Sequence, residues 1–587
     1  MKTLPPVDVV IVGGGWAGLL MAKELGARTS LSVVVLERGG ARKTENYSTD
    51  MDELDYAIRM HMMQDLSQET VTFRHSSQQR ALPLRQHGAF LPGSGIGGAG
   101  EHWNGVSPRM FPDCFELLTS STEKYGVNRL PQNHALLDWG VKYDELEPYY
   151  TLAEKLLGIC GKAGNLRGRK SEDGNIFEGW RSSEFPMPPN KIPYFSALVR
   201  DAAKSLGYHP YPIPSATPSR AYVNPDGVAR SACVYCGYCE RFGCMIGAKA
   251  QPSNLLLPVI QRHKNVSIRT GASVRRVVPE AENKKGKARG VKYVDAKGQE
   301  FFQPADLVFL ASWTFNNARL LLLSGMGQPY DPKTGEGTLG RNLTHQVAIP
   351  AATLFMEKPM NLFMGAGAAG IRVGDFDGDV FDHSNLPFFR GGALEALITG
   401  HRPIGNFGIV PQSVKATWGS EWKQAALHYY DRAAAIHFYG EHLAYKSNYV
   451  DLDPVYKDSL GDPLLRLTLN WQDNERRMAE FATAKAVEIG RAMGAKDITP
   501  FPGLRDYDAT RYQSTHVQGG AIMGASPDRS VVNSYLQHRL ATNLFVLGAS
   551  AFPQNSSANP TLTLLALVLR TADALIDRYL KHPGPLA

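Results

Sequence analysis

The sequence predicts an α/β protein (α+β overall) in which a nucleotide-binding domain, interrupted along the chain, is joined to a second domain with an antiparallel sheet. Residues 8–37 read as strand, glycine turn, helix and strand in succession. Residues 343–498 contain short alternating runs and long loops, which are typical of antiparallel strands. Residues 515–576 return to a compact, glycine-punctuated α/β pattern. A chain of 587 residues is long enough for two joined domains, so we expect its two ends to share the first of them.

The first unit has the order of elements that binds a dinucleotide. Val9–Val12 predicts a buried strand and Leu19–Leu25 a helix, with Gly13-Gly14-Gly15-Trp16-Ala17-Gly18 between them. Ser32–Leu36 predicts a second strand, which ends at Glu37. The glycines permit close approach of the backbone to a pyrophosphate, the helix N-terminus favours its charge, and an acid about 20 residues on binds a ribose hydroxyl. The sequence therefore predicts a Rossmann-like site for a dinucleotide, nicotinamide or flavin.

Composition and charge exclude several classes of function. Hydrophobic residues make up 43% of the chain and charged residues 20%, as in globular proteins. The net charge of +7 is scattered and forms no basic stripe with aromatic residues, so we expect no nucleic-acid partner. No apolar run approaches the ~20 residues that cross a bilayer. The chain enters its first strand within a few residues, so we expect no signal peptide of its own.

Further elements are expected between the two ends. Gly161–Asn224 is rich in proline, glycine and serine and is expected to wrap the surface or cover the active site. A charged turn at Lys284–Lys287 favours a β-meander of the strands around it. The expected helices are Asp52–Gln64, Tyr143–Leu157, Asn316–Ser324 and Glu475–Met493, and the expected strands are Val266–Arg269, Ser273–Pro279, Ala288–Asp295, Phe301–Gln303 and Leu307–Ala311.

The C-terminal region combines a buried helix with a histidine beside a glycine turn. Asn559 suits an N-cap and Pro560 the first helical position, and the apolar helix that follows should extend to Ile576. A buried helix N-terminus presents unpaired N–H groups, which favour a negative charge. His516 precedes Gly519-Gly520, and from the residues alone it fits either a satisfied core histidine or a functional one.

The cysteines are distributed unevenly. The chain has six, of which four form the run Cys233-x2-Cys236-x2-Cys239-x4-Cys244. So few cysteines argue against a disulfide scaffold. Zinc usually takes two separated pairs, whereas this compact run is nearer the spacing of iron–sulfur ligands. We expect an iron–sulfur cluster, either 3Fe-4S on three of the thiols or 4Fe-4S on all four.

Taken together and in order, these segments resemble the glucose–methanol–choline (GMC) flavin oxidoreductases. The matching segments are Gly13–Gly18, Gly97-Gly98 with Asn104-Gly105, Gly340-Arg341-Asn342, His516–Gly520, and Gly548-Ala549-Ser550 leading to Asn559–Thr563. The resemblance implies a discontinuous FAD-binding domain and an antiparallel-sheet substrate domain. The implied boundaries are residues 1–160, 226–342 (with the cysteines) and 511–587 (with the catalytic residues) for the FAD domain, 161–225 for a cover segment, and 343–510 for the substrate domain.

The resemblance also implies roles for individual residues. His516 would accept the proton of the substrate hydroxyl, and Asn559 would hold the same hydroxyl; many relatives have a second histidine at this asparagine. The helix beginning at Pro560 would stabilise negative charge on the reduced flavin. The implied cofactor-binding residues are Gly13, Gly15, Trp16, Ala17, Gly18, Glu37, Gly97, Gly98, His102, Trp103, Asn104, Gly105, Val274, Gly548, Ala549, Pro560 and Thr561.

Two features narrow the resemblance. His102-Trp103 has the spacing at which some members attach the flavin covalently through the histidine; a noncovalent contact is the alternative. The run Cys236–Cys244, with Asp52-Glu53-Leu54 and Gln64–Thr72, resembles the flavoprotein (large) subunits of the bacterial gluconate 2-dehydrogenase subgroup. That subgroup implies a small, signal-bearing subunit, a multihaem cytochrome c and a place on the periplasmic side of the inner membrane, held there through its partners.

The expected function is therefore an FAD-dependent dehydrogenase that oxidises a secondary hydroxyl of a sugar acid or sugar, D-gluconate to 2-keto-D-gluconate first among them. Electrons would pass through the iron–sulfur cluster to the cytochrome. The alternatives are a GMC dehydrogenase for glycosides (at carbon 3), 2-ketogluconate, fructose, glucose or sorbitol, a nicotinamide-dependent dehydrogenase, and a non-catalytic FAD subunit. A carboxylate substrate would call for an arginine or lysine, and the second domain offers Arg390 and Arg402 among others.

Overall fold

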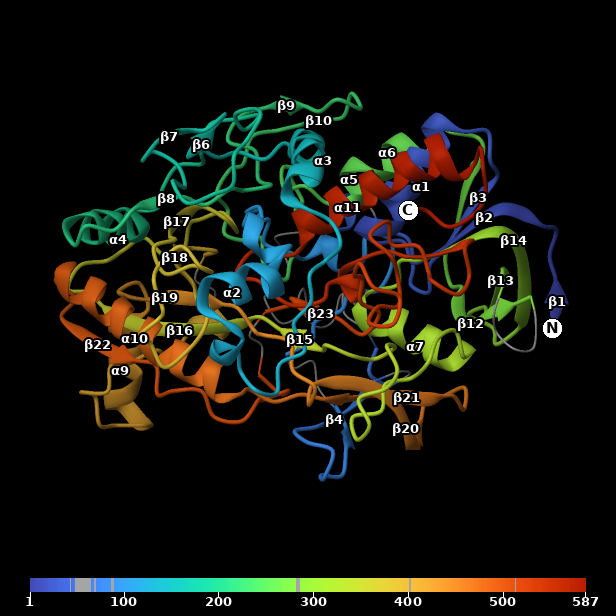
Figure 1. Ribbon diagram of the computed structural model, residues 1–587. Helices are drawn as coiled ribbons and strands as arrows, with labels where there is room; N and C mark the ends of the chain where they lie inside the picture. Colours follow the sequence, from blue (N-terminus) through green and yellow to red (C-terminus); the bar gives the residue numbers. More distant parts are fainter. Residues whose placement is uncertain are drawn as a thin grey trace.

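The computed structural model describes residues 1–42, 44–47, 65–67, 70–85, 89–280, 286–400, 403–511 and 514–587 (Figure 1). The helix expected at Asp52–Gln64 and the turn at Lys284 lie outside these residues, as does Arg402. The described residues form a mostly parallel sheet beside an antiparallel one, which confirms the predicted fold class. None of the helices within these ranges is long and apolar enough to cross a membrane.

The parallel sheet joins chain segments from both ends. Its order is β11-β3-β2-β14-β13-β12, and β24 pairs with β14 in parallel. The strands are β2 Val7–Val12, β3 Val33–Leu36, β11 Val266–Arg269, β12 Ser273–Pro279, β13 Ala288–Val294, β14 Glu300–Leu310 and β24 Leu544–Val546, with β1 Lys2–Thr3 at the edge. Because β24 lies directly on β14, the C-terminal tail joins the sheet that β2 begins.

β14 corrects one prediction, because the strands expected at Phe301–Gln303 and Leu307–Ala311 are a single strand. Its first half forms the expected meander with β13 and β12, and its second half lies between β2 and β24. The start of β14 is partly exposed and mixes polar with apolar residues, whereas its end is buried on both faces and apolar throughout. This change of environment, with Pro304 between the halves, made one strand resemble two.

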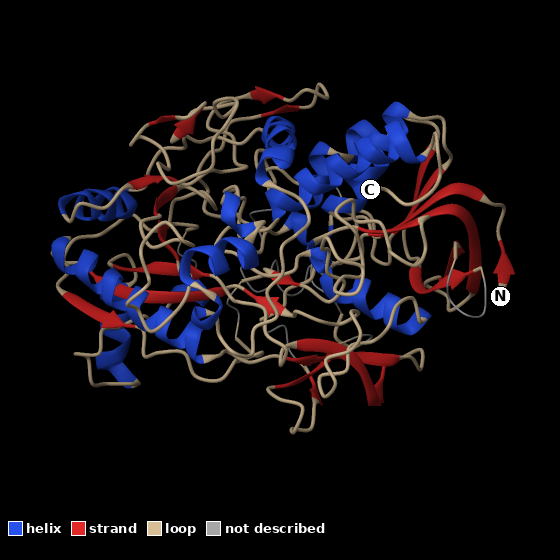
Figure 2. Cartoon of the chain, viewed as in Figure 1, coloured by secondary structure: helices blue, strands red, loops and turns tan. Residues whose placement is uncertain are grey.

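The antiparallel sheet has the order β22-β16-β19-β18-β17-β8. Its strands are β8 Pro210–Pro212, β16 Val347–Phe355, β17 Gly370–Val373, β18 Gly392–Leu397, β19 Ala433–Gly440 and β22 Asp497–Pro500. Helices α10 (Asp473–Ala492) and α4 (Tyr194–Ser205) pack on one face of it (Figures 1 and 2). The segment expected to wrap the surface, Gly161–Asn224, thus also supplies a strand and a helix to this sheet.

Three helices pack together beside the parallel sheet: α1 (Trp16–Arg28), α3 (Tyr143–Leu157) and α11 (Thr561–Ala574) (Figure 1). α3 begins and ends where the sequence predicts, since Glu145 accepts the backbone N–H of Lys142 at 3.0 Å and Gly158 ends the helix at a φ of 58°. α11 is buried over most of its length and continues into a π-helical turn, Leu575–Tyr579.

Shorter elements connect the two sheets. The pair β15 (Thr344–His345) and β23 (Val517–Gln518) is antiparallel, and a further four-stranded sheet has the order β20-β21-β4-β5. The remaining elements include α2 Leu117–Tyr125, β4 Val71–Arg74, β5 Leu82–Pro83, β6 Asn165–Leu166, β7 Arg169–Lys170, β9 Tyr222–Val223, β10 Ala229–Arg230, α5 Pro252–Leu255, α6 Leu257–Ile260, α7 Thr314–Ser324, α8 Pro403–Asn406, α9 Gly419–Tyr429, β20 Tyr449–Lys457 and β21 Pro463–Thr468.

Candidate active site

A long cavity brings the expected site residues together. It encloses about 1930 Å³ not filled by protein atoms, part of it open to solvent. Its walls come from segments far apart in the sequence, with His516, Asn559 and the start of α11 among them. The expected residues on its walls are Gly13, Gly15, Trp16, Ala17, Glu37, Gly97, Gly98, His102, Trp103, Asn104, Val274, His516, Gly548, Ala549, Asn559, Pro560 and Thr561. Gly18 and Gly105 do not line it.

The glycine turn after β2 forms one end of this cavity. Gly13 has a φ of +105°, and a Cβ there would lie 2.5 Å from the carbonyl oxygen of Ala311. A Cβ on Gly18 would lie 2.0 Å from the carbonyl oxygen of Gly13, so only a glycine allows α1 to pack this closely against the turn. The N-cap of α1 is Gly15, which has no side chain to cap the helix. The turn thus presents backbone N–H groups at a helix N-terminus, where an anionic group is favoured.

Glu37 connects two glycine-rich loops. Its carboxylate accepts the backbone N–H groups of Gly14 and Gly39, both at 2.8 Å, and that of Gly95 at 3.2 Å. The acid at the end of β3 therefore orders the turn after β2 and the loop that precedes His102. It also lies in the cavity wall, where the ribose of a dinucleotide is expected.

His102 and Trp16 both line the cavity, and each has one buried polar atom without a hydrogen-bond partner among the described residues. His102 is 3% exposed, and burial, with the charges of Lys249 and Arg42, lowers its pKa to about 3. Within the described part of the chain, neither His102 Nε2 nor Trp16 Nε1 has a hydrogen-bond partner. Buried polar atoms are normally paired, so both fit a site completed by a bound group. The FAD that the resemblance implies meets this requirement.

His516 and Asn559 lie next to each other in the cavity wall. Asn559 Nδ2 is 3.2 Å from His516 Nε2, and Gln346 Oε1 is 2.6 Å from His516 Nδ1. Burial, and then the nearby His345, lowers the pKa of His516 to about 3, so its imidazole is neutral at physiological pH. A neutral, oriented imidazole beside an amide can accept a proton from a hydroxyl that contacts both groups.

The start of α11 corrects the prediction that Asn559 is its N-cap. Pro560 occupies that position, and no side chain caps the helix. The Asn559 carboxamide contacts His516 instead. The first turn of α11, with Pro560 and Thr561 in the cavity wall, is therefore left to interact with an anionic part of a bound group.

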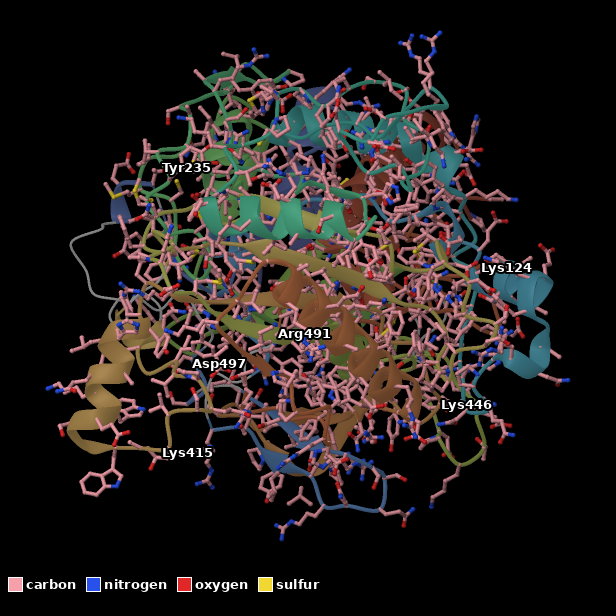
Figure 3. The ribbon with its side chains drawn as sticks, turned by 90° about the vertical axis from the view of Figure 1, so that its left-hand side faces the viewer. Lys124, Tyr235, Lys415, Lys446, Arg491 and Asp497 are labelled. Carbon is pink, nitrogen blue, oxygen red and sulfur yellow. The ribbon has the colours of Figure 1, made fainter. Side chains whose placement is uncertain are left out.

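The four clustered cysteines lie in one loop but do not form a ligand set in the structure. None of the described cysteines forms a disulfide. The described residues contain no group of three or more His, Cys, Asp or Glu side chains placed to hold a metal ion. The backbone N–H of Tyr235 donates to Cys233 Sγ at 3.3 Å, and that of Lys249 to Cys244 Sγ at 3.5 Å. Tyr235, labelled in Figure 3, lies near the edge of the molecule in that view.

Lys249 ties the cysteine loop to the His102 loop. Its buried ammonium donates to the carbonyl oxygens of Glu101 (3.1 Å) and Trp103 (2.6 Å) on one side. On the other side it donates to those of Cys239 and Phe242, both at 2.8 Å. Sequence reasoning missed this residue and Gln346, because their roles depend on contacts between distant segments. A lysine or glutamine in a long loop gives no periodic or spacing signal.

Arg390 does not meet the expectation of a carboxylate receptor. Its guanidinium is 1% exposed and pairs with Glu441 at 2.7 Å and with Asp113. The pairing satisfies the charge that a substrate carboxylate would require. In the structure Arg390 therefore joins the antiparallel sheet to the loop before α2.

Comparison with known proteins agrees with this geometry. A family model described as GMC oxidoreductase matches residues 186–348, a second model of that family matches residues 444–567, and a lycopene cyclase model matches residues 8–77. The chain is 44% identical to the gluconate 2-dehydrogenase flavoprotein of Pantoea cypripedii, over 99% of this chain and 95% of that protein. It is 26% identical to the fructose dehydrogenase large subunit of Gluconobacter japonicus, over 97% and 98%.

Solved structures share the fold at low sequence identity. Pyridoxine 4-oxidase from Mesorbium loti has a TM-score of 0.57 at 19% identity, covering 98% of this chain and 100% of that one. A formate oxidase variant from Aspergillus oryzae RIB40 has a TM-score of 0.59 at 15% identity, covering 99% of both chains. The chain therefore belongs to the GMC oxidoreductase family and is an FAD-dependent oxidoreductase that acts on CH–OH groups.

Proposed function

We propose that the chain is the catalytic flavoprotein subunit of a gluconate 2-dehydrogenase, which oxidises D-gluconate to 2-keto-D-gluconate. The observation that carries this proposal is the His516–Asn559 pair in the cavity of a chain so similar to the Pantoea cypripedii flavoprotein. A dehydrogenase for another sugar or sugar acid is the second candidate, favoured by the similarity to the fructose dehydrogenase large subunit. Membership of an FAD-dependent family favours both over the nicotinamide alternative.

In this proposal the chain's residues bind, orient and deprotonate the substrate. FAD, when bound, accepts the hydride of the substrate carbon. His516 takes the hydroxyl proton at Nε2, and Asn559 holds that hydroxyl against the imidazole. The glycine turn that begins at Gly13 would bind the pyrophosphate of the cofactor, and the first turn of α11 would stabilise negative charge on the reduced flavin.

His102 is proposed to hold the flavin covalently. Its ring lies in the cavity wall, buried and neutral, and Nε2 lacks a partner within the described residues. Acid precipitation tests the bond: the flavin should stay with the protein pellet. Free flavin in the supernatant would instead show that His102 makes a noncovalent contact.

The cysteine loop is proposed to hold an iron–sulfur cluster. Four thiols within twelve residues, backbone N–H groups directed at two sulfurs, and the buried Lys249 cation support this proposal. The loop would have to rearrange to bring the thiols around the cluster, because they are not placed as a ligand set among the described residues. Burial raises the pKa of Cys233 to about 12 and that of Cys239 to about 11, so these thiols would lose their protons on binding metal. Iron and acid-labile sulfide in the purified protein would support the cluster, their ratio would separate 3Fe-4S from 4Fe-4S, and zinc in their place would refute it.

Partner subunits complete the proposal. The relatives are named as a flavoprotein and as a large subunit, which suits a chain that works within a complex. We expect a small signal-bearing subunit and a multihaem cytochrome c, which would carry the chain to the periplasmic side of the inner membrane. Co-purification of a haem protein with the tagged chain from its native membranes would support this assembly, and a tagged chain recovered alone would count against it.

A substrate panel with an artificial electron acceptor tests the function directly. Gluconate should be oxidised faster than 2-ketogluconate, glucose, fructose or sorbitol. His516→Ala should lower kcat by about 10²–10⁴ with the flavin retained, because the general base is lost. His582→Ala, a change at an exposed histidine, is the matched control. Full turnover in His516→Ala would remove His516 from the mechanism, whereas a flavin-loaded wild-type protein without turnover would favour the non-catalytic subunit.

A further inference from the structure

Gln346 is buried beside His516, at the ring nitrogen that does not contact Asn559, and is not one of the two catalytic residues. Its Oε1 lies 2.6 Å from His516 Nδ1. Its Nε2 lies 3.0 Å from the carbonyl oxygen of Ser556 and 2.7 Å from that of Ser557. The side chain is fully buried, so these contacts are made without competition from solvent.

The two carbonyl oxygens determine how the Gln346 amide is oriented. Only the NH₂ group can face two carbonyl oxygens, because an amide oxygen placed there would have no donor. The amide oxygen must therefore face His516, and an oxygen can only accept, so His516 Nδ1 must carry the proton. His516 Nε2 is then the unprotonated nitrogen, and Asn559 Nδ2 can donate to it at 3.2 Å.

The backbone explains why Gln346 reaches both catalytic segments. In the β15–β23 pair His345 lies opposite Val517, which places Gln346 opposite His516 in the same register. Ser556 and Ser557 lie in the loop that leads directly into Asn559. The Gln346 side chain thus contacts Nδ1 of His516 and also binds the loop that leads into Asn559.

We propose that Gln346 is a positioning residue that fixes His516 as the Nδ1–H tautomer, so that Nε2 is the atom that takes the substrate proton. The inference rests on the proposed function, in which His516 is the base. The other titratable group facing His516 among the described residues is His345, whose two nitrogens are held by Tyr507 Oη at 2.5 Å and the Ser514 carbonyl oxygen at 2.9 Å. His345 is thus engaged elsewhere and does not set the tautomer.

Removal of the amide is the first test. Gln346→Leu keeps a similar volume but loses both the acceptor for His516 and the donors for the 556–557 loop. We expect kcat for gluconate to fall about 10- to 100-fold while KM changes less than about threefold, because the base is misoriented and the substrate site is kept. Gln261→Leu, at an exposed glutamine, is the matched control. Flavin absorbance per protein shows whether each variant is folded and loaded.

Replacement by an acid is the second test, and a purely structural role would not produce its result. A carboxylate in Gln346→Glu still accepts from His516 Nδ1, but its second oxygen faces the Ser556 and Ser557 carbonyl oxygens without a donor, so kcat should recover only in part and exceed that of Gln346→Leu. The negative charge also stabilises the imidazolium, so the acidic limb of the kcat/KM profile should move to higher pH. The wild-type protein should show no such limb from His516 above about pH 5, since its pKa is about 3.

The outcomes separate the two proposals. If the wild-type protein oxidises no sugar or sugar acid, or His516→Ala keeps full turnover, the proposed function fails. If those tests succeed and Gln346→Leu keeps the wild-type kcat, the inference about Gln346 alone is overturned. A flavin-loaded Gln346→Glu variant that is as slow as Gln346→Leu, with an unchanged pH profile, also overturns it.

Discussion

Replacing Lys249 by methionine should release the cysteine loop from the His102 loop. Lys249 is fully buried, and its ammonium lies 2.6–3.1 Å from four backbone carbonyl oxygens, which share its three N–H donors. Lys249→Met keeps the length of the side chain and removes every one of these hydrogen bonds. Three of these carbonyl oxygens belong to buried residues, Glu101, Cys239 and Phe242, so the loss of their partner carries the cost of an unsatisfied buried acceptor.

The size of the effect follows from two opposing terms. Each buried acceptor that loses a charge-assisted partner costs about 1–2 kcal/mol, which gives about 4–8 kcal/mol for the four. Removal of the buried ammonium returns several kcal/mol of desolvation, and burial does lower the pKa of Lys249. A net loss of about 2–4 kcal/mol of local stability remains, which corresponds to about 30- to 700-fold in the opening equilibrium.

Hydrogen–deuterium exchange measured by mass spectrometry detects this local opening. Peptides covering 239–249 and 98–105 should exchange about 30- to 700-fold faster in Lys249→Met, whereas peptides of the antiparallel sheet should not change. Lys264→Met, at an exposed lysine, is the control. Unchanged exchange in both loops would refute the reasoning that this ammonium joins them.

Two further predictions concern the cofactor and the pH dependence of stability. Gly13→Ala should abolish retention of FAD, measured as flavin absorbance per protein after desalting, because its Cβ would lie 2.5 Å from Ala311 O at a φ of +105°; Gly40→Ala, with open space around its Cβ, should keep the flavin. Burial raises the pKa of Glu475 from 4.5 to about 7. The native state therefore holds a proton that the unfolded state releases, and stability from this group is complete below pH 4.5 and is lost as the pH rises toward 7. The melting temperature of Glu475→Gln should thus rise relative to that of the wild-type protein between pH 5 and 8, and a constant difference would contradict the prediction.

Features that depend only on neighbouring residues could be predicted from the sequence. α3 ends at Gly158, where one residue with positive φ is required, and it starts after Lys142, where an acid three positions on caps the backbone. Both limits can therefore be predicted from the sequence. The turn at Gly13 can be predicted because it also requires a glycine with positive φ. The prediction of two strands in place of β14 is wrong because the neighbouring strands, rather than the residues of β14, decide which half is buried.

The same distinction between local features and contacts of distant segments applies to the candidate active site. That His516 and Asn559 lie in one cavity could be expected from the characteristic order of their segments, but the interaction with Gln346, on which the proposed role of His516 as a base depends, could not. That interaction needs the amide of Gln346, 170 positions earlier, to be oriented by carbonyl oxygens 210 and 211 positions after it. No periodicity encodes such separations, since they arise from the pairing of β15 with β23 and the packing of the 556–557 loop. Asn559 shows the consequence: its sequence context favours a helix cap, yet the tertiary contact with His516 takes the side chain instead.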